Sequence, residues 1–568
     1  MGEGDEPQDE GRGARTREPS RRVRLRAPAF PVMLAALGLG VVFLLHLRRW
    51  SFLCDDAFIS FRYARNLGQH GALVYNLDPL ERVEGYTNLL WVLILAVGDA
   101  LGLAPERLAP VLTATASLAS LGLVALIGAS LRRRFGPGPA DRHAFALVDL
   151  LAPALLALTP EFVVWGSGGL EGSLALALGL GAVFAWLRGR IELAAGLAAL
   201  AGLTRLDSLL WIASFGLGWL ALVAVDQPRP PIPWRRVALA TLVFLAPLLA
   251  QLLARKLYYG EWLPNTWAVK HHGALLRGTY GRAYLEFWAD RLALIWLAPV
   301  LVLLRPRHVL LVLPIAAQLI WAWSIGGDFM AYGRFLLPAT TLLALLLGLA
   351  LAEALAVARA RFAPQLLAAL ALALVIALGL RIPDRLREDR EHAHLHIDYQ
   401  DPHPTPGFEG VDAMHRFAAI RLAAGAAFAE QLPPGTRITV GAAGALPYAA
   451  GLPAYDAYGL IDPRVVAATE PRVDRARPGH QLHASIETML AREPDLLCHI
   501  GYAGERAPDR ALARRMGAPR GWTGWACVET GPIPDRRAES GSLANHHYCC
   551  IRPTRRFQDL DPQQRPRP

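Results

Sequence analysis

The chain has 568 residues, of which 53% are hydrophobic and 19% are charged. Its apolar residues fall into repeated runs of about 18 to 24 residues, which is more than a soluble domain can bury. The formal charge of +10 would suit a nucleic-acid partner. However, the arginines stand at the ends of apolar runs, where they fix membrane orientation, and no basic patch is interleaved with aromatic residues. The composition therefore excludes a nucleic-acid-binding protein and predicts one that crosses the membrane many times.

The N-terminal 1–27 segment is polar and rich in arginine, and we expect a disordered cytoplasmic tail. The first apolar run, 28–47, follows it and has no small-residue cleavage site, so it is interpreted as an anchor. The arginines between Arg12 and Arg26 place the N-terminus in the cytoplasm by the positive-inside rule. The segment after this run, the 48–107 loop, is then expected on the outer face.

Two apolar runs, 88–103 and 108–131, pose the next question. If both crossed the membrane, the run Arg132, Arg133, Arg134 would lie outside, against the positive-inside rule. The shorter run is also interrupted by glycine and aspartate. We therefore expect 88–103 to lie along the outer interface and 108–131 to be the second span.

The later spans then follow in alternating directions. They are expected at 145–164, 170–187, 191–203, 208–225, 237–257, a run that ends at 305, 309–325, 335–355 and 362–380. This gives a polytopic α-helical protein of the inner (plasma) membrane with about 11 transmembrane helices. The membrane region is 28–380, and a soluble α/β domain, 381–568, is expected on the extracytoplasmic side.

This topology collects the unusual polar motifs on the outer face. Each motif alone could be an ordinary solvated loop end, but their joint location favours function, because ionisable groups at membrane depth are costly. The motifs contain the candidate residues that follow. Catalytic candidates are Asp55 and Asp56; donor-phosphate candidates are Arg62, Arg205, Lys270 and Arg334; substrate-binding candidates are Glu84, Tyr86, Asn88, Glu171, Asp207, Asn265 and Asp328.

The chemistry follows from the residue types. Adjacent carboxylates directly after the first span suit a general base that activates an acceptor hydroxyl, or a divalent-cation site at Asp55 and Asp56. In an extended segment they would point to opposite faces, so one is expected to reach the acceptor, and Asp55 is favoured. The four cationic side chains suit a lipid-linked phosphate, because Arg offers a bidentate fork. The alternative is that each of them snorkels or fixes orientation.

Two stretches make the sequence recognisable: Asp55-Asp56-Ala-Phe-Ile-Ser-Phe-Arg62 and Glu81-Arg-Val-Glu-Gly-Tyr-Thr-Asn-Leu-Leu-Trp91. They resemble the polytopic GT-C glycosyltransferases, specifically the group that includes the mycobacterial terminal arabinofuranosyltransferase. Further matches follow in order at 167–171, 204–207, 258–265, 326–338 and 443–448. Gly169 is an addition to the family's pattern, and Leu206 replaces its proline.

The resemblance implies an inverting glycosyltransferase whose first outer loop carries the catalytic carboxylate. It also implies a polyprenyl-phosphate sugar donor and an envelope glycan or glycolipid acceptor on the extracytoplasmic face. Because the group is used for several sugars, the choice between a hexosyl and a pentosyl donor stays open.

The C-terminal part is predicted to hold a helix near 411–431 and short strands at 437–441 and 495–500. On the oxidising side a disulfide is expected that joins Cys527 to Cys549 or Cys550, whereas Cys54 is interpreted as a packing residue. Two groups of histidines are either zinc ligands or solvated linker residues: His392, His394 and His396, and His546 and His547. Four aromatic residues fit either stacking on a sugar ring or a buried core: Trp522, Trp525, Tyr455 and Tyr458.

Two other classes of protein share many of these features. A membrane transporter or lipid flippase of envelope precursors would also have many spans, but it predicts inverted repeats and polar residues at the middle of the membrane. The sequence has no clear internal repeat, and its polar motifs gather at one interface. A non-catalytic scaffold of the same fold is the third alternative, against which the intact Asp55-Asp56 pair argues.

Overall fold

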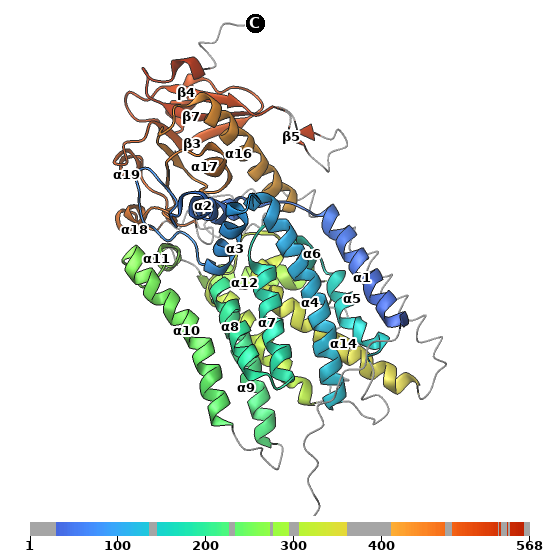
Figure 1. Cartoon of the computed structure of the whole chain (residues 1–568). Coiled ribbons are helices and arrows are strands. Elements are labelled where there is room, and N and C mark those ends of the chain that lie inside the picture. The colour runs from blue at the N-terminus through green and yellow to red at the C-terminus, as the bar shows by residue number, and fades with distance from the viewer. Residues whose placement is uncertain are drawn as a thin grey trace, which may run out of the picture.

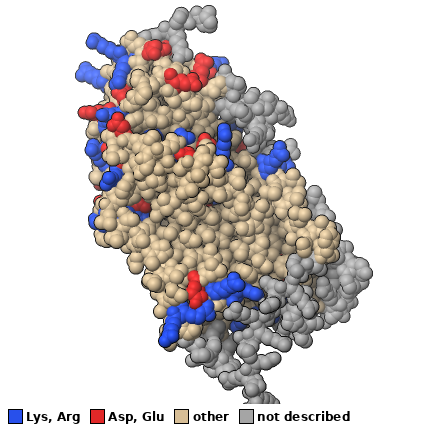
Figure 2. Space-filling view, in the orientation of Figure 1, with Lys and Arg blue, Asp and Glu red and all other residues tan. Residues whose placement is uncertain are grey.

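The computed structural model describes residues 30–135, 145–225, 233–272, 277–292, 294, 301, 306–359, 410–471, 480–531, 533–534, 542–543 and 546–561. A bundle of helices makes up the first part, and an α/β region sits on one end of the bundle (Figure 1). On the face that Figure 2 shows, most charged side chains lie toward the two ends of the molecule, and a broad uncharged band separates them.

The helices of the bundle correspond closely to the predicted apolar runs. In chain order they are α1 (Phe30–Arg49), α2 (Asp55–His70), α3 (Leu89–Ala100), α4 (Pro105–Phe135), α5 (Leu151–Ala157), α6 (Pro160–Trp165), α7 (Gly172–Leu187), α8 (Ile191–Thr204), α9 (Ser208–Val225), α10 (Trp234–Tyr259), α11 (Asn265–His272), α12 (Arg277–Arg291), α13 (Val312–Ser324) and α14 (Leu337–Arg359). Three 3₁₀ segments accompany them: η2 (Leu147–Leu150), η4 (Pro306–Leu311) and η5 (Ala331–Leu336).

Within the residues that the structure describes, four stretches of helix are long and apolar enough to cross a membrane: 30–49, 105–135, 234–259 and 331–356. Six shorter apolar helices accompany them within the described part of the chain. The chain is thus a helical membrane protein, but this structure does not establish the expected eleven spans. Two of the predicted spans, 362–380 and most of the run that ends at 305, lie outside the described residues.

Three local predictions can be compared with the backbone. The run 145–164 was expected to be one span, but it is broken into η2, α5 and α6, and Pro160 occupies the first turn of α6. Proline cannot continue the preceding helix because it lacks an N–H donor. The run 88–103 forms only the 12-residue α3, about 18 Å long, which is too short to cross a membrane. This agrees with its exclusion from the spans.

The Asp55-Asp56 pair is the third case, and here the prediction of an extended segment is wrong. Both residues lie in the first turn of α2, which starts after Cys54 and ends at Gly71 with a left-handed φ of 67°. Carboxylates are favoured there because the unpaired N–H groups of the first turn carry partial positive charge. Neighbouring residues of a helix point in different directions, so the two carboxylates still diverge.

The α/β region contains a five-stranded sheet and several short helices. Its elements are α16 (Val411–Gln431), β1 (Ile438–Val440), α17 (Ala445–Ala450), β2 (Ala454–Asp456), α18 (Pro463–Ala468), α19 (Ile486–Leu490), β3 (Leu496–Gly504), α20 (Arg510–Arg515), β4 (Gly524–Glu529), β5 (Ile533–Pro534), β6 (Ser542–Leu543), β7 (His547–Arg552) and η7 (Gln558–Leu560). The strand order is β2-β1-β3-β7-β4, with β1 parallel to β2 and β3, and β7 antiparallel to β3 and β4. The predicted helix and both predicted strands are present.

Two disulfides cross this sheet, Cys498–Cys550 and Cys527–Cys549. Cys549 and Cys550 are neighbours on β7, so their side chains point to opposite faces of the sheet. Each face therefore has its own cross-link. The expected pairing of Cys527 with one of these two is present, whereas the second disulfide was not predicted. Cys54 is buried, and its thiol donates to the carbonyl of Gly168 at 3.3 Å.

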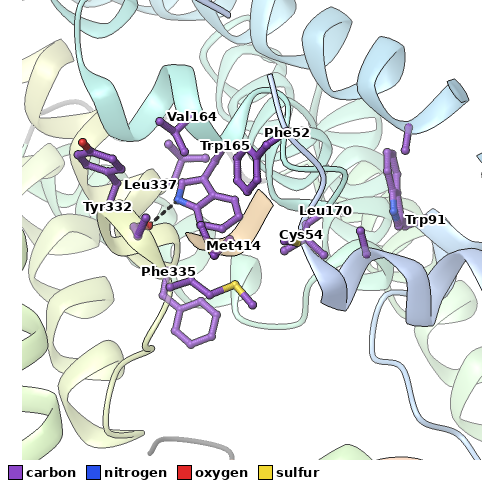
Figure 3. Packing of buried hydrophobic residues seen from close by; sticks show 14 of the residues in the cluster. Phe52, Cys54, Trp91, Val164, Trp165, Leu170, Tyr332, Phe335, Leu337 and Met414 are labelled. Atoms are coloured by element: carbon purple, nitrogen blue, oxygen red, sulfur yellow. Dashed lines mark hydrogen bonds between the residues drawn. The ribbon is translucent and has the colours of Figure 1, made fainter. Parts of the chain in front are cut away.

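The α/β region and the bundle share one hydrophobic core. Met414 of α16 belongs to the same buried cluster as Trp165 of α6 and Phe335 of η5, and Figure 3 shows its side chain between these two rings. The indole N–H of Trp165 donates to the carbonyl of Ala331 at 3.0 Å. This shared core holds the α/β region over the end of the bundle where α2 and η5 lie.

Candidate active site

The two neighbouring carboxylates have different surroundings. Asp55 faces the α/β region, where the backbone N–H of Ala445 donates to its Oδ1 at 2.9 Å. The approach is close, since a Cβ built on Gly444 would overlap the Asp55 carbonyl. Burial raises the pKa of Asp55 to about 6, although the charge of Arg421 opposes the shift. Asp55 is thus partly buried, with one carboxylate oxygen engaged at the contact between the two regions.

Asp56 points elsewhere. Its side chain is 40% exposed, and its Oδ2 lies 3.7 Å from Nη2 of Arg334. Arg334 also forms an ion pair with Asp328, with its Nε donating to Oδ2 of that carboxylate. The φ values of Gly326, Gly327 and Tyr332 are positive, which lets this short connection fold back and present Arg334 beside Asp56. Of the two catalytic candidates, Asp56 is therefore the one that is accessible next to a cation.

Arg205 is held by a chain of polar contacts. Its Nη1 donates to Glu171 at 2.9 Å, and its Nε and Nη2 donate to the carboxylate of Asp207 at 3.1 and 3.2 Å. Glu171 in turn accepts from the side-chain amide of Asn88 at 2.9 Å. Asn88 and Glu171 are buried, so they orient Arg205 and are not themselves open to a substrate.

Lys270 of α11 completes the group. Its side chain is exposed to solvent, yet the surrounding protein and the charges of Arg334 and Arg205 lower its pKa. Asp328 and Asp56 act on it electrostatically in the opposite sense. Among the described residues, no carboxylate lies within ion-pair distance of its ammonium. We call Arg205, Lys270 and Arg334 the cation cluster; in this cluster Lys270 is the side chain whose charge is left available to an anion.

The fourth cationic candidate does not belong to this cluster. Arg62 is buried, and its guanidinium donates to the carbonyls of Tyr75, Pro447 and Leu452 at 2.7, 2.5 and 2.8 Å. It also donates to Oδ1 of Asn76 at 3.1 Å. With its donors committed to these acceptors, Arg62 joins α2 to the α/β region. The expectation that it binds a donor phosphate does not fit these contacts.

Three of the predicted substrate-binding residues are also engaged in contacts within the protein. Glu84 forms an ion pair with Arg255 of α10, and the hydroxyl groups of Tyr86 and Tyr259 lie 3.2 Å apart. The side-chain amide of Asn265 donates to two carbonyls of the α/β region. The predicted set therefore divides. Asp56, Asp328 and Asp207 lie with the cation cluster, whereas Arg62, Glu84, Tyr86 and Asn265 bind parts of the protein together.

No grouping of three or more His, Cys, Asp or Glu side chains that could hold a metal ion occurs in the described part of the chain. Asp55 and Asp56 have different partners, Ala445 and Arg334, and a cation held by both carboxylates stays a prediction. Three of the histidines considered for zinc, His392, His394 and His396, lie outside the described residues. The imidazole of His547 lies 3.9 Å from Glu529.

The aromatic candidates divide in the same way. Trp525 is fully buried, with its N–H donated to the carbonyl of Asp509 at 2.8 Å, and Tyr455 is buried as well. These two belong to the core. Tyr458 is half-buried, and its ring lies 4.8 Å from that of His480, which in turn lies 5.0 Å from Phe329. Tyr458 is therefore close to the loop that carries Asp328.

Sequence reasoning missed the contact between Arg492 and the outer loop. The guanidinium of Arg492 forms ion pairs with Glu81 of the outer loop and with Asp462 of the α/β region. Asp462 ends the stretch Asp456-Ala-Tyr-Gly-Leu-Ile-Asp462, which we call the 456–462 loop. Its two buried aspartates around a glycine were a turn signal that could have drawn attention to it.

Comparisons with known proteins agree with this description. Residues 412–546 match the family described as Domain of unknown function (DUF8728). No curated protein matches the chain. Among solved structures, ArnT from Cupriavidus metallidurans in the apo state has a TM-score of 0.56 at 16% identity and covers 92% of this chain and 97% of its own. The same protein bound to undecaprenyl phosphate gives 0.54 at 14% identity, with coverage of 91% and 97%.

At this level of identity the likeness concerns the fold. The chain shares its fold with ArnT over nearly its whole length. The resemblance to the GT-C superfamily is therefore supported as a statement about fold, and the narrower resemblance to the arabinofuranosyltransferase group stays a prediction.

Proposed function

We propose that the chain is a glycosyltransferase that moves a sugar from a polyprenyl-phosphate donor to an envelope glycan or glycolipid acceptor. The observation that carries the proposal is the position of the cation cluster beside the accessible carboxylate of Asp56. A phosphate leaving group needs cationic donors, and an acceptor hydroxyl needs a base. The shared fold with ArnT, which has been solved with undecaprenyl phosphate bound, adds support for a lipid-linked phosphate.

In the proposed reaction, the donor phosphate binds at Lys270, with Arg334 and Arg205 completing the positive surroundings. The acceptor hydroxyl lies against Asp56, which takes its proton as the oxygen attacks the anomeric carbon. The new glycosidic bond forms as the bond between the anomeric carbon and the phosphate oxygen breaks, and polyprenyl phosphate leaves with the electron pair. Attack opposite to the leaving group inverts the anomeric configuration.

Asp56, and not the initially favoured Asp55, is proposed as the base. A base must reach the proton that it removes, and one carboxylate oxygen of Asp55 already accepts a hydrogen bond from the α/β region. Asp55 is assigned a positioning role, since it fixes the first turn of α2 from which Asp56 extends.

The side of the membrane follows from the arginine pattern, and we propose that the cation cluster faces the extracytoplasmic side of the inner membrane. Single cysteines in a chain whose Cys54 is replaced by serine would test this orientation. A cysteine at Arg133 is expected to be protected from a membrane-impermeant maleimide in intact cells, and one at Glu261, which is exposed between α10 and α11, is expected to react. The reverse pattern would place the site in the cytoplasm.

The activity can be tested with the purified full-length protein in detergent. A panel of labelled polyprenyl-phosphate sugars, both pentosyl and hexosyl, is supplied with an envelope glycan fraction. At least one donor is expected to give labelled glycan and free polyprenyl phosphate. If no donor is consumed, but the protein moves a labelled polyprenyl-phosphate sugar across the bilayer of liposomes, the chain is a flippase and the proposal fails.

A further inference from the structure

The region that matches the domain of unknown function accepts hydrogen bonds from the helix that carries Lys270. The side-chain amide of Asn265, the first residue of α11, donates to the carbonyls of Gly459 and Leu460 at 2.7 and 2.8 Å. These carbonyls belong to the 456–462 loop. The backbone N–H of Asn265 donates to the carbonyl of Glu84 at 3.1 Å, which ties the same point to the outer loop.

Lys270 depends on this anchor because α11 is short. The helix has eight residues, and Lys270 lies five residues after Asn265, about 7.5 Å farther along the axis. At the other end, Nη2 of Arg277 donates to the carbonyl of Lys270 at 2.9 Å. A helix of this length is marginal by itself, so it is held by contacts at its ends together with the buried side chains of Thr266 and Val269.

The 456–462 loop, whose carbonyls accept from Asn265, is stabilised by hydrogen bonds of its own. Asp456 is buried and accepts backbone N–H groups from Tyr458 and Leu460 at 2.8 and 2.6 Å, and Gly459 has a positive φ of 83°. These contacts fix the direction of the two carbonyls that Asn265 binds. At its far end, the loop is tied to Glu81 of the outer loop through Asp462 and Arg492.

The outer loop also packs directly against the 456–462 loop. A Cβ built on Gly85 would lie 2.6 Å from Cγ2 of Ile461, closer than ordinary contact allows. The chain therefore leaves no room for a side chain between the outer loop and the 456–462 loop. Glu84, which precedes this glycine, is the residue whose carbonyl accepts from Asn265.

We propose that Asn265 is a positioning residue of the donor site, and that the 456–462 loop sets Lys270 in place through it. The inference rests on the proposed function and extends it. It assigns the region matched by the domain of unknown function a part in holding the polyprenyl phosphate through α11, since the three residues of the cation cluster lie outside that region.

The test compares Asn265→Ala with a matched control, Asn76→Ala. Asn76 makes the same kind of contact between the two regions, with its amide donating to the Ala454 carbonyl at 2.9 Å and its oxygen accepting from the Ala454 N–H at 3.1 Å. It does not touch α11. Both variants lose amide hydrogen bonds to the α/β region, so both are expected to unfold at a lower temperature.

Only the Asn265 variant is expected to change donor kinetics. In the transfer assay with purified full-length protein, Asn265→Ala is expected to raise the donor KM about 10-fold with kcat within about twofold of wild type. Asn76→Ala is expected to leave the donor KM unchanged. If Asn265→Ala is poorly folded, Asn265→Asp replaces it, since aspartate keeps the volume but cannot donate to the two carbonyls.

A double variant shows whether Asn265 acts through Lys270. In a Lys270→Gln background, Asn265→Ala is expected to give no further rise in the donor KM, because the group that it positions is gone. Full additivity, or an unchanged donor KM in Asn265→Ala, would overturn the inference. The proposed function would survive either result as long as Lys270→Gln itself weakens the donor.

Discussion

The cation cluster and the junction of the bundle with the α/β region use the same types of residue in different ways. At the junction, the donors of Arg62 and Asn265 end on backbone carbonyls, and Arg492 ends on two carboxylates. In the cation cluster, the ammonium of Lys270 is accessible and no described carboxylate pairs with it. At the junction, donors that already have acceptors hold the two regions together, whereas in the cation cluster the accessible ammonium of Lys270 is available to a ligand.

The same contrast separates the two aspartates. Asp55 accepts from the α/β region and belongs to the junction, whereas Asp56 lies beside Arg334 of the cation cluster. These two neighbouring residues of α2 therefore have different proposed roles: Asp55 is a positioning residue, and Asp56 is the base. Variants of residues in the junction and in the cation cluster test this difference.

The largest effect is expected for Asp56→Asn. Loss of a general base typically lowers the rate 10²–10⁴-fold, so kcat is expected to fall by about 10³ with little change in thermal stability. Asp55→Asn keeps an oxygen that can accept from Ala445 and is expected to retain kcat within about 10-fold. The check is kcat of both variants in the transfer assay. A larger loss in Asp55→Asn than in Asp56→Asn would return the base to Asp55.

The next effect concerns Lys270. Hydrogen bonds to charged groups contribute roughly 1.5–3 kcal/mol, so Lys270→Gln is expected to raise the donor KM about 10–100-fold. The kcat at saturating donor is expected to change less. Steady-state kinetics over a range of donor concentrations measure both. An unchanged donor KM would mean that the open charge in the cation cluster does not face the phosphate.

A smaller effect, on stability and not on binding, is expected for Arg62→Met. The substitution leaves several buried carbonyls without a donor, and each unpaired group costs about 1–3 kcal/mol unless water reaches it. We expect a loss of roughly 3 kcal/mol, read as a lower unfolding temperature in detergent. The donor KM of the folded fraction should stay at the wild-type value. A raised donor KM with normal stability would move Arg62 into the donor site.

The smallest effect is a pH dependence at the 456–462 loop. Burial raises the pKa of Asp456 from 3.8 to about 7. Because the folded pKa lies above the unfolded one, the contribution to stability is full below about 3.8 and is lost as pH rises through about 7. Lowering the pH from 8 to 6 should therefore stabilise the wild type by about 1.4 kcal/mol more than Asp456→Asn. Equal unfolding-temperature profiles would show that Asp456 does not titrate in this range.

Much of the fold could be read from the sequence because apolar runs and turn signals are local. The helix Val411–Gln431 and the helix Ser208–Val225 have the predicted bounds. Pro160 interrupts the expected span at 145–164, and the length of an apolar run alone does not predict such a break. The pairing of Cys498 with Cys550 depends on the order of strands in the sheet, which local patterns do not specify.

The sequence predicts the candidate site as one set of outer-face residues. The structure shows which of them lie near the cation cluster and which join parts of the protein. Residue type marks Arg62 and Lys270 equally, but only tertiary contacts show that acceptors from 385 and 390 residues away saturate Arg62. In the same way, the position of Asn265 against the 456–462 loop is fixed by a contact between distant parts of the chain. Non-local partners of this kind leave no periodic signal in the sequence.

The central claim is that the cation cluster receives the phosphate of a polyprenyl carrier. The most direct measurement is binding of undecaprenyl phosphate to the purified full-length protein, with undecaprenol, which lacks the phosphate, as the matched ligand. The account predicts saturable binding of the phosphate by the wild type, at least about 10-fold weaker binding by Lys270→Gln, and weak binding of undecaprenol by both. Equal affinity for the two lipids, or an unchanged affinity in Lys270→Gln, would contradict it.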